Sequence, residues 1–281
     1  MIVTLLIASA IYAVQLWRYG SHVTPDGAYY LAMGRGHSVP APYAYRLMPR
    51  YIGSLAGWRV VHVVSYLALI AAAYVAVHAQ APSVAMPAAL TLAALPSVRM
   101  SISWPVLLDM PSWAVVGTSL ALAHYDPVTA VCVALLGIVV TEKTPWFAVA
   151  TIAPLIDWHV AVIALCWLVC SSVLLWWSTK TAVADRDWLQ HPFREAIARH
   201  RTSNITNWLL PWGGAVVALP FLNYSAWCVV LLSYAQCFIA QDRARLYMMA
   251  APVVITSLAT FEPLTVFAVA VITYLIPQTE V

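Results

Sequence analysis

The chain has 281 residues, of which 63% are hydrophobic and only 9% are charged. Soluble domains carry about 25% charged residues, so this composition excludes an ordinary soluble protein and predicts an integral membrane protein. The formal net charge of +3 is too small to predict a nucleic-acid partner. All five cysteines lie inside apolar stretches and lack the spacing of metal ligands, so we expect no metal or other cofactor.

Apolar stretches separated by short breaks run along the whole chain and predict an all-α, polytopic transmembrane bundle of about 11 spans. A helical span needs roughly 17–25 apolar residues, and spans in thin or water-lined bundles are shorter. No repeat or linker divides the sequence, so we predict a single transmembrane domain over residues 1–281. The predicted spans are 1–17, 59–79, 84–101, 109–124, 127–141, 144–157, 158–178, 208–222, 224–240, 245–260 and 262–277.

The breaks between these spans alternate in character. One set is long and charged, and comprises residues 18–58, 99–109, 142–143, 179–207 and 241–245. The other set is short and nearly uncharged, and comprises residues 80–83, 124–127, 157–159, 223 and 261–263. Because successive breaks of a membrane bundle fall on opposite sides of the membrane, the alternation predicts one working face that gathers the charged side chains.

The first long break, residues 18–58, is expected to contain a surface helix. Thr24 has the residue type of an N-cap, and Pro25 suits the first turn of the helix that follows. This helix would end around Gly34 and Gly36, because glycine is the usual residue after a helix C-terminus.

Two further surface helices are predicted. Residues 42–56 place apolar and basic side chains on neighbouring stripes, a pattern typical of a helix that lies along the membrane interface. The second long break, residues 179–207, contains a charged helical segment over 192–201. It also contains Asp185 and Asp187, whose spacing can hold a divalent cation but is common by chance among surface charges, so metal binding is not the expected role.

Asp26 is the first candidate for chemistry. It stands in the first turn of the helix that follows Thr24, where the helix macrodipole stabilises an ionised carboxylate. A lone aspartate at this position would merely cap the helix. Tyr29 and Tyr30 follow three and four residues later beside the same surface, and they favour a binding site that includes Tyr30.

Arg46 and Arg50 are four residues apart, on one face of the predicted interfacial helix. Two parallel guanidinium groups suit a phosphate or diphosphate, which each can bind through two hydrogen bonds. The alternative is that both side chains extend to lipid headgroups.

Charged residues in three later segments face the same side by the alternation of breaks. Asp109 lies between apolar residues, where a carboxylate costs on the order of 2.5–3.5 kcal/mol and therefore needs a partner or a wet cavity. Glu142 and Lys143 interrupt another apolar run, either to neutralise each other or to join the site. Arg243 and Arg245 open a late span. Acids and arginines that converge on one face are the strongest functional signal in the sequence.

Five short stretches carry a resemblance to a known family: Thr24-Pro-Asp26-Gly-Ala-Tyr-Tyr30, Pro42-Tyr-Ala-Tyr-Arg46-Leu-Met-Pro49, Pro105-Val-Leu-Leu-Asp109-Met-Pro111, Thr141-Glu-Lys143-Thr and Asp242-Arg-Ala-Arg245. In their order they resemble the GT-C superfamily of integral-membrane glycosyltransferases, which use polyprenyl-phosphate-linked sugars as donors. The likeness covers most of the chain in layout. The first-loop site here lacks an acidic pair, which speaks against a metal-dependent mechanism.

The resemblance implies an inverting sugar transfer from a polyprenyl-phosphate-linked donor to the hydroxyl group of an acceptor whose identity is unknown, next to membrane lipid. Asp26 would be the general base that takes the acceptor's proton as its oxygen attacks the anomeric carbon. Arg46 and Arg245 would hold the lipid phosphate and stabilise it as the leaving group. Asp109 and Lys143 would line the cavity or bind sugar hydroxyls.

The resemblance also implies a multi-pass protein, encoded by a prokaryote or a phage, of the inner or plasma membrane, with its active face outside the cytoplasm. The positive-inside rule alone would instead place the charged face in the cytoplasm. Two other functions remain open. A transporter or flippase for a lipid-linked or anionic substrate would show inverted repeats with broken midplane helices, and a non-catalytic membrane scaffold would need no buried charge.

Overall fold

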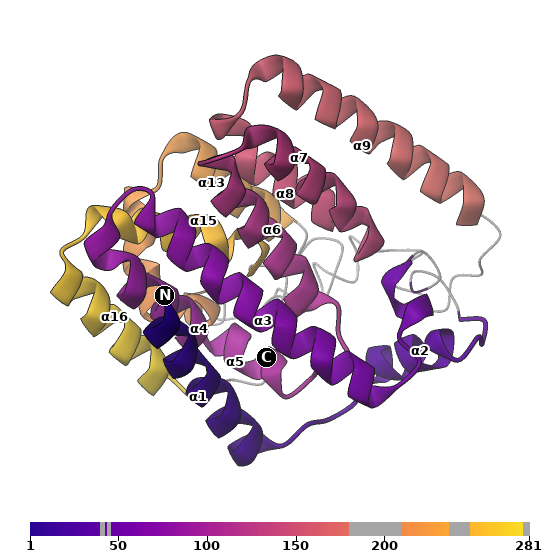
Figure 1. Ribbon diagram of the computed structural model, residues 1–281, viewed down its shortest axis with the longest axis horizontal. Helices are drawn as coiled ribbons and strands as arrows, with labels where there is room; N and C mark the ends of the chain where they lie inside the picture. Colours follow the sequence, from indigo (N-terminus) through magenta and orange to yellow (C-terminus); the bar gives the residue numbers. More distant parts are fainter. Residues whose placement is uncertain (40–42, 44–45, 180–208, 236–247, 278–281) are drawn as a thin grey trace.

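The computed structural model describes residues 1–39, 43, 46–179, 209–235 and 248–277, and every regular element within these ranges is a helix. The predicted all-α class is therefore confirmed (Figure 1). The first half contains α1 (Ile2–Tyr19), α2 (Pro25–Gly34), η2 (Met48–Tyr51), α3 (Leu55–His78), η3 (Pro82–Val84), α4 (Ala85–Ala94), α5 (Pro96–Ile102) and α6 (Asp109–Ala123). The second half contains α7 (Pro127–Leu136), η4 (Gly137–Val139), α8 (Thr144–Ile152), η5 (Ala153–Leu155), α9 (Trp158–Thr179), η6 (Leu210–Phe221), α13 (Tyr224–Ala235), η8 (Met248–Ala250), α15 (Ala251–Thr256), η9 (Ser257–Thr260) and α16 (Pro263–Leu275).

Two of these helices, α1 and α3, are long and apolar enough to cross a membrane. The pair α4 and α5 adds a third crossing if the two are counted as one broken span, since they are bent by 59°. Pro96 explains this bend: it has no N–H for the helical ladder, and Leu95 before it is held in an extended conformation with ψ of 134°. By length and composition, the described helices thus provide two or three membrane crossings. The sequence predicts about eleven spans.

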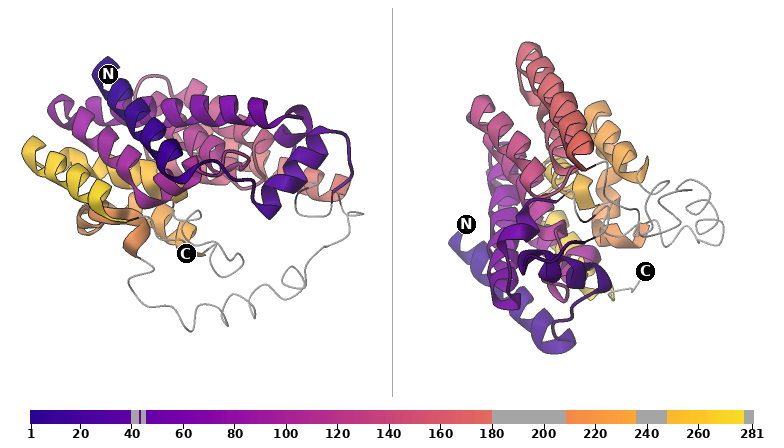
Figure 2. Two further views of the ribbon diagram at one scale, coloured as in Figure 1. Left: turned by 90° about the horizontal axis from the view of Figure 1, so that it is seen from below. Right: turned by 90° about the vertical axis from the view of Figure 1, so that its right-hand side faces the viewer.

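The helices pack around α3, which crosses the middle of the molecule in Figure 1. It packs against α4 and α6, while α6 also packs against α7 and α8. In the views of Figures 1 and 2, α1 and α9 lie at opposite edges, and α9 contacts α7 and α8. The large side chains of Tyr66, Trp113 and Trp212 are fully buried in the core of the bundle.

The predicted surface helix after the first apolar stretch is confirmed as α2. The Thr24 hydroxyl accepts a hydrogen bond from the Gly27 N–H at 3.1 Å, and Pro25 occupies the first turn. The helix ends at Gly34, which packs directly on the backbone of the chain at Ile52: a Cβ on Gly34 would lie 2.2 Å from the Ile52 carbonyl oxygen. The absence of a side chain at Gly34 therefore allows the two segments to touch.

The predicted helix over residues 42–56 is wrong. Arg46 and Leu47 belong to no helix, η2 spans only Met48–Tyr51, and α3 begins independently at Leu55. Pro49 has no N–H group, and its ring clashes with the preceding turn of a helix. A continuous helix therefore cannot pass through it, although the apolar residues recur at helical spacing. Ser54 then caps α3 by accepting the Gly57 N–H at 3.0 Å, which is a new helix start rather than a continuation.

A small second core joins this first loop to the bundle. Besides the main core, the buried side chains of Tyr30, Tyr43, Trp58, Val106, Leu107, Leu108 and Val140 form one cluster. They come from α2, the start of α3, and the segments that precede α6 and α8. Tyr43 adds a residue from the chain between α2 and η2, so this cluster brings five separate parts of the sequence to one end of the bundle.

Later predictions are met only in part. The span predicted over 208–222 is η6, a 3₁₀ helix interrupted at Gly213, whose φ is 53°. The segment at 192–201, the aspartates Asp185 and Asp187, and the arginines Arg243 and Arg245 lie outside the described residues.

Candidate functional site

A small cavity lies at the end of the bundle where α2 meets the start of α6 and the segment before α8. Its volume is about 60 Å³, room for a few water molecules at roughly 10–15 Å³ each. The described residues that line it are Asp26, Tyr30, Arg46, Leu107, Leu108, Asp109, Thr141 and Lys143. The structure thus brings five residues predicted from the sequence to one hollow: Asp26, Tyr30, Arg46, Asp109 and Lys143.

The carboxylate of Asp26 is half-buried and oriented by Tyr43. The Tyr43 hydroxyl donates a hydrogen bond to Asp26 Oδ1 at 2.7 Å, and the Tyr43 ring stacks on Tyr29 at 4.6 Å between ring centroids. Tyr43 is buried, so its hydroxyl group is held in a fixed position. No role for Tyr43 was predicted, although its position three residues before Arg46 places it next to a candidate site residue in the sequence.

Gly27 lets α2 approach the chain just before α6. A Cβ at this position would lie 2.9 Å from the Val106 carbonyl oxygen and 3.2 Å from the Val106 Cβ. The first contact is with a backbone atom and is shorter than real Cβ atoms show, and the second is tighter than most real Cβ contacts. The close approach therefore sets the separation between Asp26 on α2 and Asp109 at the start of α6.

Replacing Gly27 with alanine is expected to destabilise this end of the protein. Overpacking of a tight contact costs typically about 1–3 kcal/mol, because α2 must move away from Val106. Thermal unfolding of the purified variant should show a lower transition temperature than wild type. Ala28→Ser, which adds one atom at the exposed neighbouring position, is the control and should unfold like wild type. Equal transition temperatures for both variants would contradict the tight contact.

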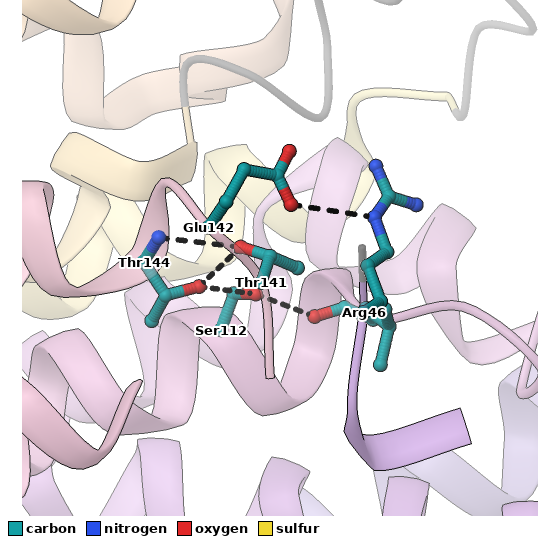
Figure 3. Close-up of polar contacts among 6 residues, drawn as sticks. Arg46, Ser112, Thr141, Glu142 and Thr144 are labelled. Carbon is teal, nitrogen blue, oxygen red and sulfur yellow. Dashed lines mark hydrogen bonds and ion pairs between the residues drawn. The ribbon is translucent and has the colours of Figure 1, made fainter. Parts of the chain in front are cut away.

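Arg46 is held between two aromatic rings and one carboxylate. Its guanidinium carbon lies 5.4 Å from the centroid of the Tyr30 ring and 5.7 Å from that of the Tyr43 ring, within the range of a cation–π contact. Arg46 Nε approaches Glu142 Oε2 at 3.7 Å (Figure 3). This distance makes an ion pair but exceeds a hydrogen bond, and both atoms are buried without a hydrogen-bond partner among the described residues.

A chain of hydroxyl groups fixes the segment that carries Glu142 and Lys143. Thr141 Oγ1 and Thr144 Oγ1 are 2.6 Å apart, and Thr144 donates to Ser112 Oγ at 2.9 Å (Figure 3). Ser112 in turn donates to the Leu108 carbonyl at 2.7 Å. These bonds tie the start of α8 to the first turn of α6. Glu142, for which the sequence left open a pairing with Lys143, forms an ion pair with Arg46.

Two arginines lie elsewhere. Arg50 is exposed in η2 and lines a different surface hollow with residues 33–39, so the predicted parallel pair of Arg46 and Arg50 does not form, because no continuous helix joins them. Arg99, the basic residue nearest to Asp109 in the sequence, is buried and donates from Nε to the Ala94 carbonyl at 2.9 Å. It also donates to the Ile276 carbonyl beyond the end of α16.

The short uncharged breaks meet at the opposite end of the bundle. A second cavity is lined by residues that lie in or next to five different breaks of this set. They are Gln80, His124, Leu155, Asn223 and Thr260. Residues in or next to the five short breaks thus gather around one cavity, whereas residues in or next to three of the charged breaks line the other. Among the described residues, no three His, Cys, Asp or Glu side chains gather as a metal site would require.

The comparisons with known proteins add no relative, since no family model, curated protein or solved structure matches this chain.

Proposed function

We propose that the protein is a multi-pass membrane glycosyltransferase of the GT-C type, which transfers a sugar from a polyprenyl-phosphate-linked donor to an acceptor hydroxyl with inversion. The observation that carries the proposal is the cavity in which Asp26 and Asp109 face Arg46 and Lys143. It costs free energy to enclose two carboxylates and two cations in an apolar bundle. Such charged groups cluster at functional sites. A non-catalytic scaffold gains nothing from them.

In this reaction Asp26 removes the proton of the acceptor hydroxyl while the hydroxyl oxygen attacks the anomeric carbon. The bond between that carbon and the phosphate oxygen breaks on the opposite face, and the phosphate leaves with the electron pair. Tyr43 supports the role of Asp26, because its hydrogen bond at 2.7 Å orients the carboxylate. The proton ends on Asp26, and the anomeric configuration inverts.

Arg46 and Lys143 act on the leaving group. Their positive charges stabilise the negative charge that develops on the phosphate as the glycosidic bond breaks. The pair between Arg46 and Glu142 is too long for a hydrogen bond, so it holds the guanidinium in place and leaves its N–H groups for phosphate. A cavity of about 60 Å³ takes the reacting groups rather than the whole donor.

The exposed surface supports the proposed membrane location. Large apolar side chains are exposed along α1, α9 and α16, and contiguous exposed apolar surface is typical of contact with a membrane or a partner. They include Ile2, Trp17, Ile163, Leu174, Phe267 and Leu275. Several helices are shorter than a full span, and a bundle with cavities at both ends accommodates such helices in a locally thin membrane.

A multi-pass arrangement predicts that Ser38 and Tyr125 lie on opposite sides of the membrane. Both are exposed, and they follow α2 and α6 at opposite ends of the bundle. In a background without the five native cysteines, Ser38→Cys and Tyr125→Cys should react with an impermeant maleimide from opposite sides of oriented vesicles. Tyr224→Cys, at a position that is 93% exposed beside the second cavity, is the control and should label with Tyr125→Cys. Labelling of all three from one side would contradict the arrangement.

The function is tested with the purified protein in lipid nanodiscs and polyprenyl phosphates that carry radiolabelled glucose, mannose, galactose or arabinose. Addition of a membrane extract as the acceptor source should convert at least one donor to free polyprenyl phosphate and a labelled product with inverted configuration. If none of these donors is consumed, and polyprenyl phosphate itself does not bind, the glycosyltransferase proposal is rejected.

A further inference from the structure

The second cavity lies at the far end of α6 from Asp109. Its volume is about 330 Å³. The helix α6 begins at Asp109 and has 15 residues, and His124 follows its last residue and lines this cavity. At about 1.5 Å per residue, α6 separates the two cavities by about 22 Å. The second cavity is therefore not part of the site around Asp26.

The polar groups of this cavity are uncharged. Of the described residues that line it, none is an Asp, Glu, Lys or Arg. The hydroxyl groups of Thr256, Ser257 and Thr260 donate to the carbonyls of Val253, Val254 and Ser257 at 2.8, 2.6 and 2.9 Å. Because each hydroxyl proton is used in this way, these groups present lone pairs to the cavity as acceptors. An anion would meet the repulsive lone pairs of these three hydroxyl groups, and a metal cation would find no carboxylate among the described lining residues.

Asn223 supplies a donor at the same cavity. Its Oδ1 accepts from the Ala226 N–H at 2.9 Å and from Ser225 Oγ at 2.8 Å. The backbone N–H fixes the orientation of the amide, since only the oxygen can accept it. The two N–H groups of the Asn223 side chain therefore point away from these bonds, and the cavity combines several acceptors with at least one donor group.

Two polar atoms of the cavity wall have no hydrogen-bond partner among the described residues: Thr151 Oγ1 and His124 Nε2 are buried and unpaired. Thr151 is only 5% exposed and lies on α8. A buried polar atom without a partner costs free energy, which a bound polar molecule restores by completing the hydrogen bond. The unpaired Thr151 hydroxyl group therefore indicates a bound ligand, independently of the other polar groups of the cavity.

The remaining wall is apolar and fits a molecule with C–H faces. Leu120, Val229 and Val253 line the interior, and Phe221 adds an aromatic ring that packs edge-on against Phe261 at 4.9 Å between ring centroids. The volume lies in the range of small-molecule sites, roughly 300–1,000 Å³. A wall of acceptors, a few donors and one aromatic ring suits a ligand with several hydroxyl groups on an apolar ring.

We propose that this cavity binds a neutral, hydroxyl-rich molecule of about monosaccharide size. The ligand's hydroxyl groups donate to Thr256, Ser257 and Thr260, and they accept from Asn223 and Thr151. A free sugar and the headgroup of a neutral glycolipid share this chemistry. The proposal does not depend on the function proposed for the Asp26 cavity.

Saturation-transfer NMR tests the proposal on the full chain in lipid nanodiscs, which avoids the sugar headgroups of common detergents. The probes are methyl β-glucoside, a monoglucosyl diacylglycerol built into the nanodisc, and inorganic phosphate. We expect methyl β-glucoside to bind, with an affinity lowered at least fivefold by Thr151→Val, which removes only the hydroxyl group. Thr91→Val is the matched control, because Thr91 is buried and its hydroxyl already donates to the Pro87 carbonyl at 2.9 Å.

The outcomes separate the possible sources of the ligand. Competition of the glycolipid against methyl β-glucoside at much lower concentration identifies a lipid headgroup as the ligand, whereas no competition identifies a free sugar. Ala226→Phe places a large side chain in the cavity and should abolish the binding of methyl β-glucoside and of the glycolipid headgroup. Asp26→Asn should leave the binding of both unchanged. The proposal is overturned if no glucoside signal is seen, if Thr151→Val and Thr91→Val behave alike, or if phosphate competes as well as the sugar.

Discussion

Asp26→Asn is expected to reduce the rate of sugar transfer by about 10²- to 10⁴-fold, the usual contribution of a general base. Asparagine has the shape of aspartate and can still accept the hydrogen bond from Tyr43, so the fold and donor binding should remain. What it loses is the ability to take the acceptor's proton. The measurement is the single-turnover rate with a donor that the wild-type protein consumes.

Asp126→Asn is the matched control for this prediction. Asp126 lies at the other end of the bundle and caps α7 by accepting the N–H groups of Val128 and Thr129 at 3.1 and 3.3 Å. Asparagine caps helices as well as aspartate does, so this variant should transfer sugar at the wild-type rate. If Asp26→Asn retains a rate within about twofold of wild type, Asp26 is not the base.

Arg46→Ala is expected to weaken the binding of polyprenyl phosphate about 10- to 100-fold. A hydrogen bond to a charged group contributes about 1.5–3 kcal/mol, and each 1.4 kcal/mol is tenfold in affinity. The guanidinium of Arg46 is already held by Tyr30, Tyr43 and Glu142, so little conformational entropy is lost when it binds phosphate. Titration of protein-bearing nanodiscs with polyprenyl phosphate measures the effect, and uncharged polyprenol should bind equally to both proteins.

Two further variants separate phosphate contact from structural damage. Arg50→Ala removes a neighbouring arginine that lines a different hollow and should leave the affinity for polyprenyl phosphate unchanged. Arg46→Ala combined with Glu142→Gln removes the carboxylate that loses its counter-charge, so the double variant should fold normally yet bind as weakly as Arg46→Ala. Full recovery of affinity in the double variant would show that Arg46 only neutralises Glu142.

The surface helix that carries Asp26 was predictable because its determinants are local. Thr24, Pro25 and Gly34 stand within a few residues of the helix ends that they define. The start of α6 at Asp109 and of α7 at Pro127 also follow from local sequence. The helix predicted over 42–56 failed because a hydrophobic pattern was given more weight than Pro49, whose missing N–H interrupts a helix whatever its neighbours are.

The contacts that make the cavity were not predictable in the same way. Tyr43 reaches Asp26 because both belong to segments that pack on the buried cluster of Tyr30, Trp58 and Leu108. The pairing of Arg46 with Glu142 joins the first loop to the segment before α8. Sequence alone offered Lys143 and Arg99 as plausible partners for the acidic residues, and no rule of spacing chooses among them.

Composition and the alternating breaks by themselves determined that this chain is a helical, strongly apolar protein whose long breaks are charged and whose short breaks are nearly uncharged. They did so because hydrophobic run lengths and helix caps act over a few residues. Only the tertiary structure decided which charged groups share a cavity, that Arg50 is not among them, and that a second, uncharged cavity exists. Such choices depend on close packing between segments far apart in the chain, such as Gly27 against Val106, and no local pattern encodes that distance.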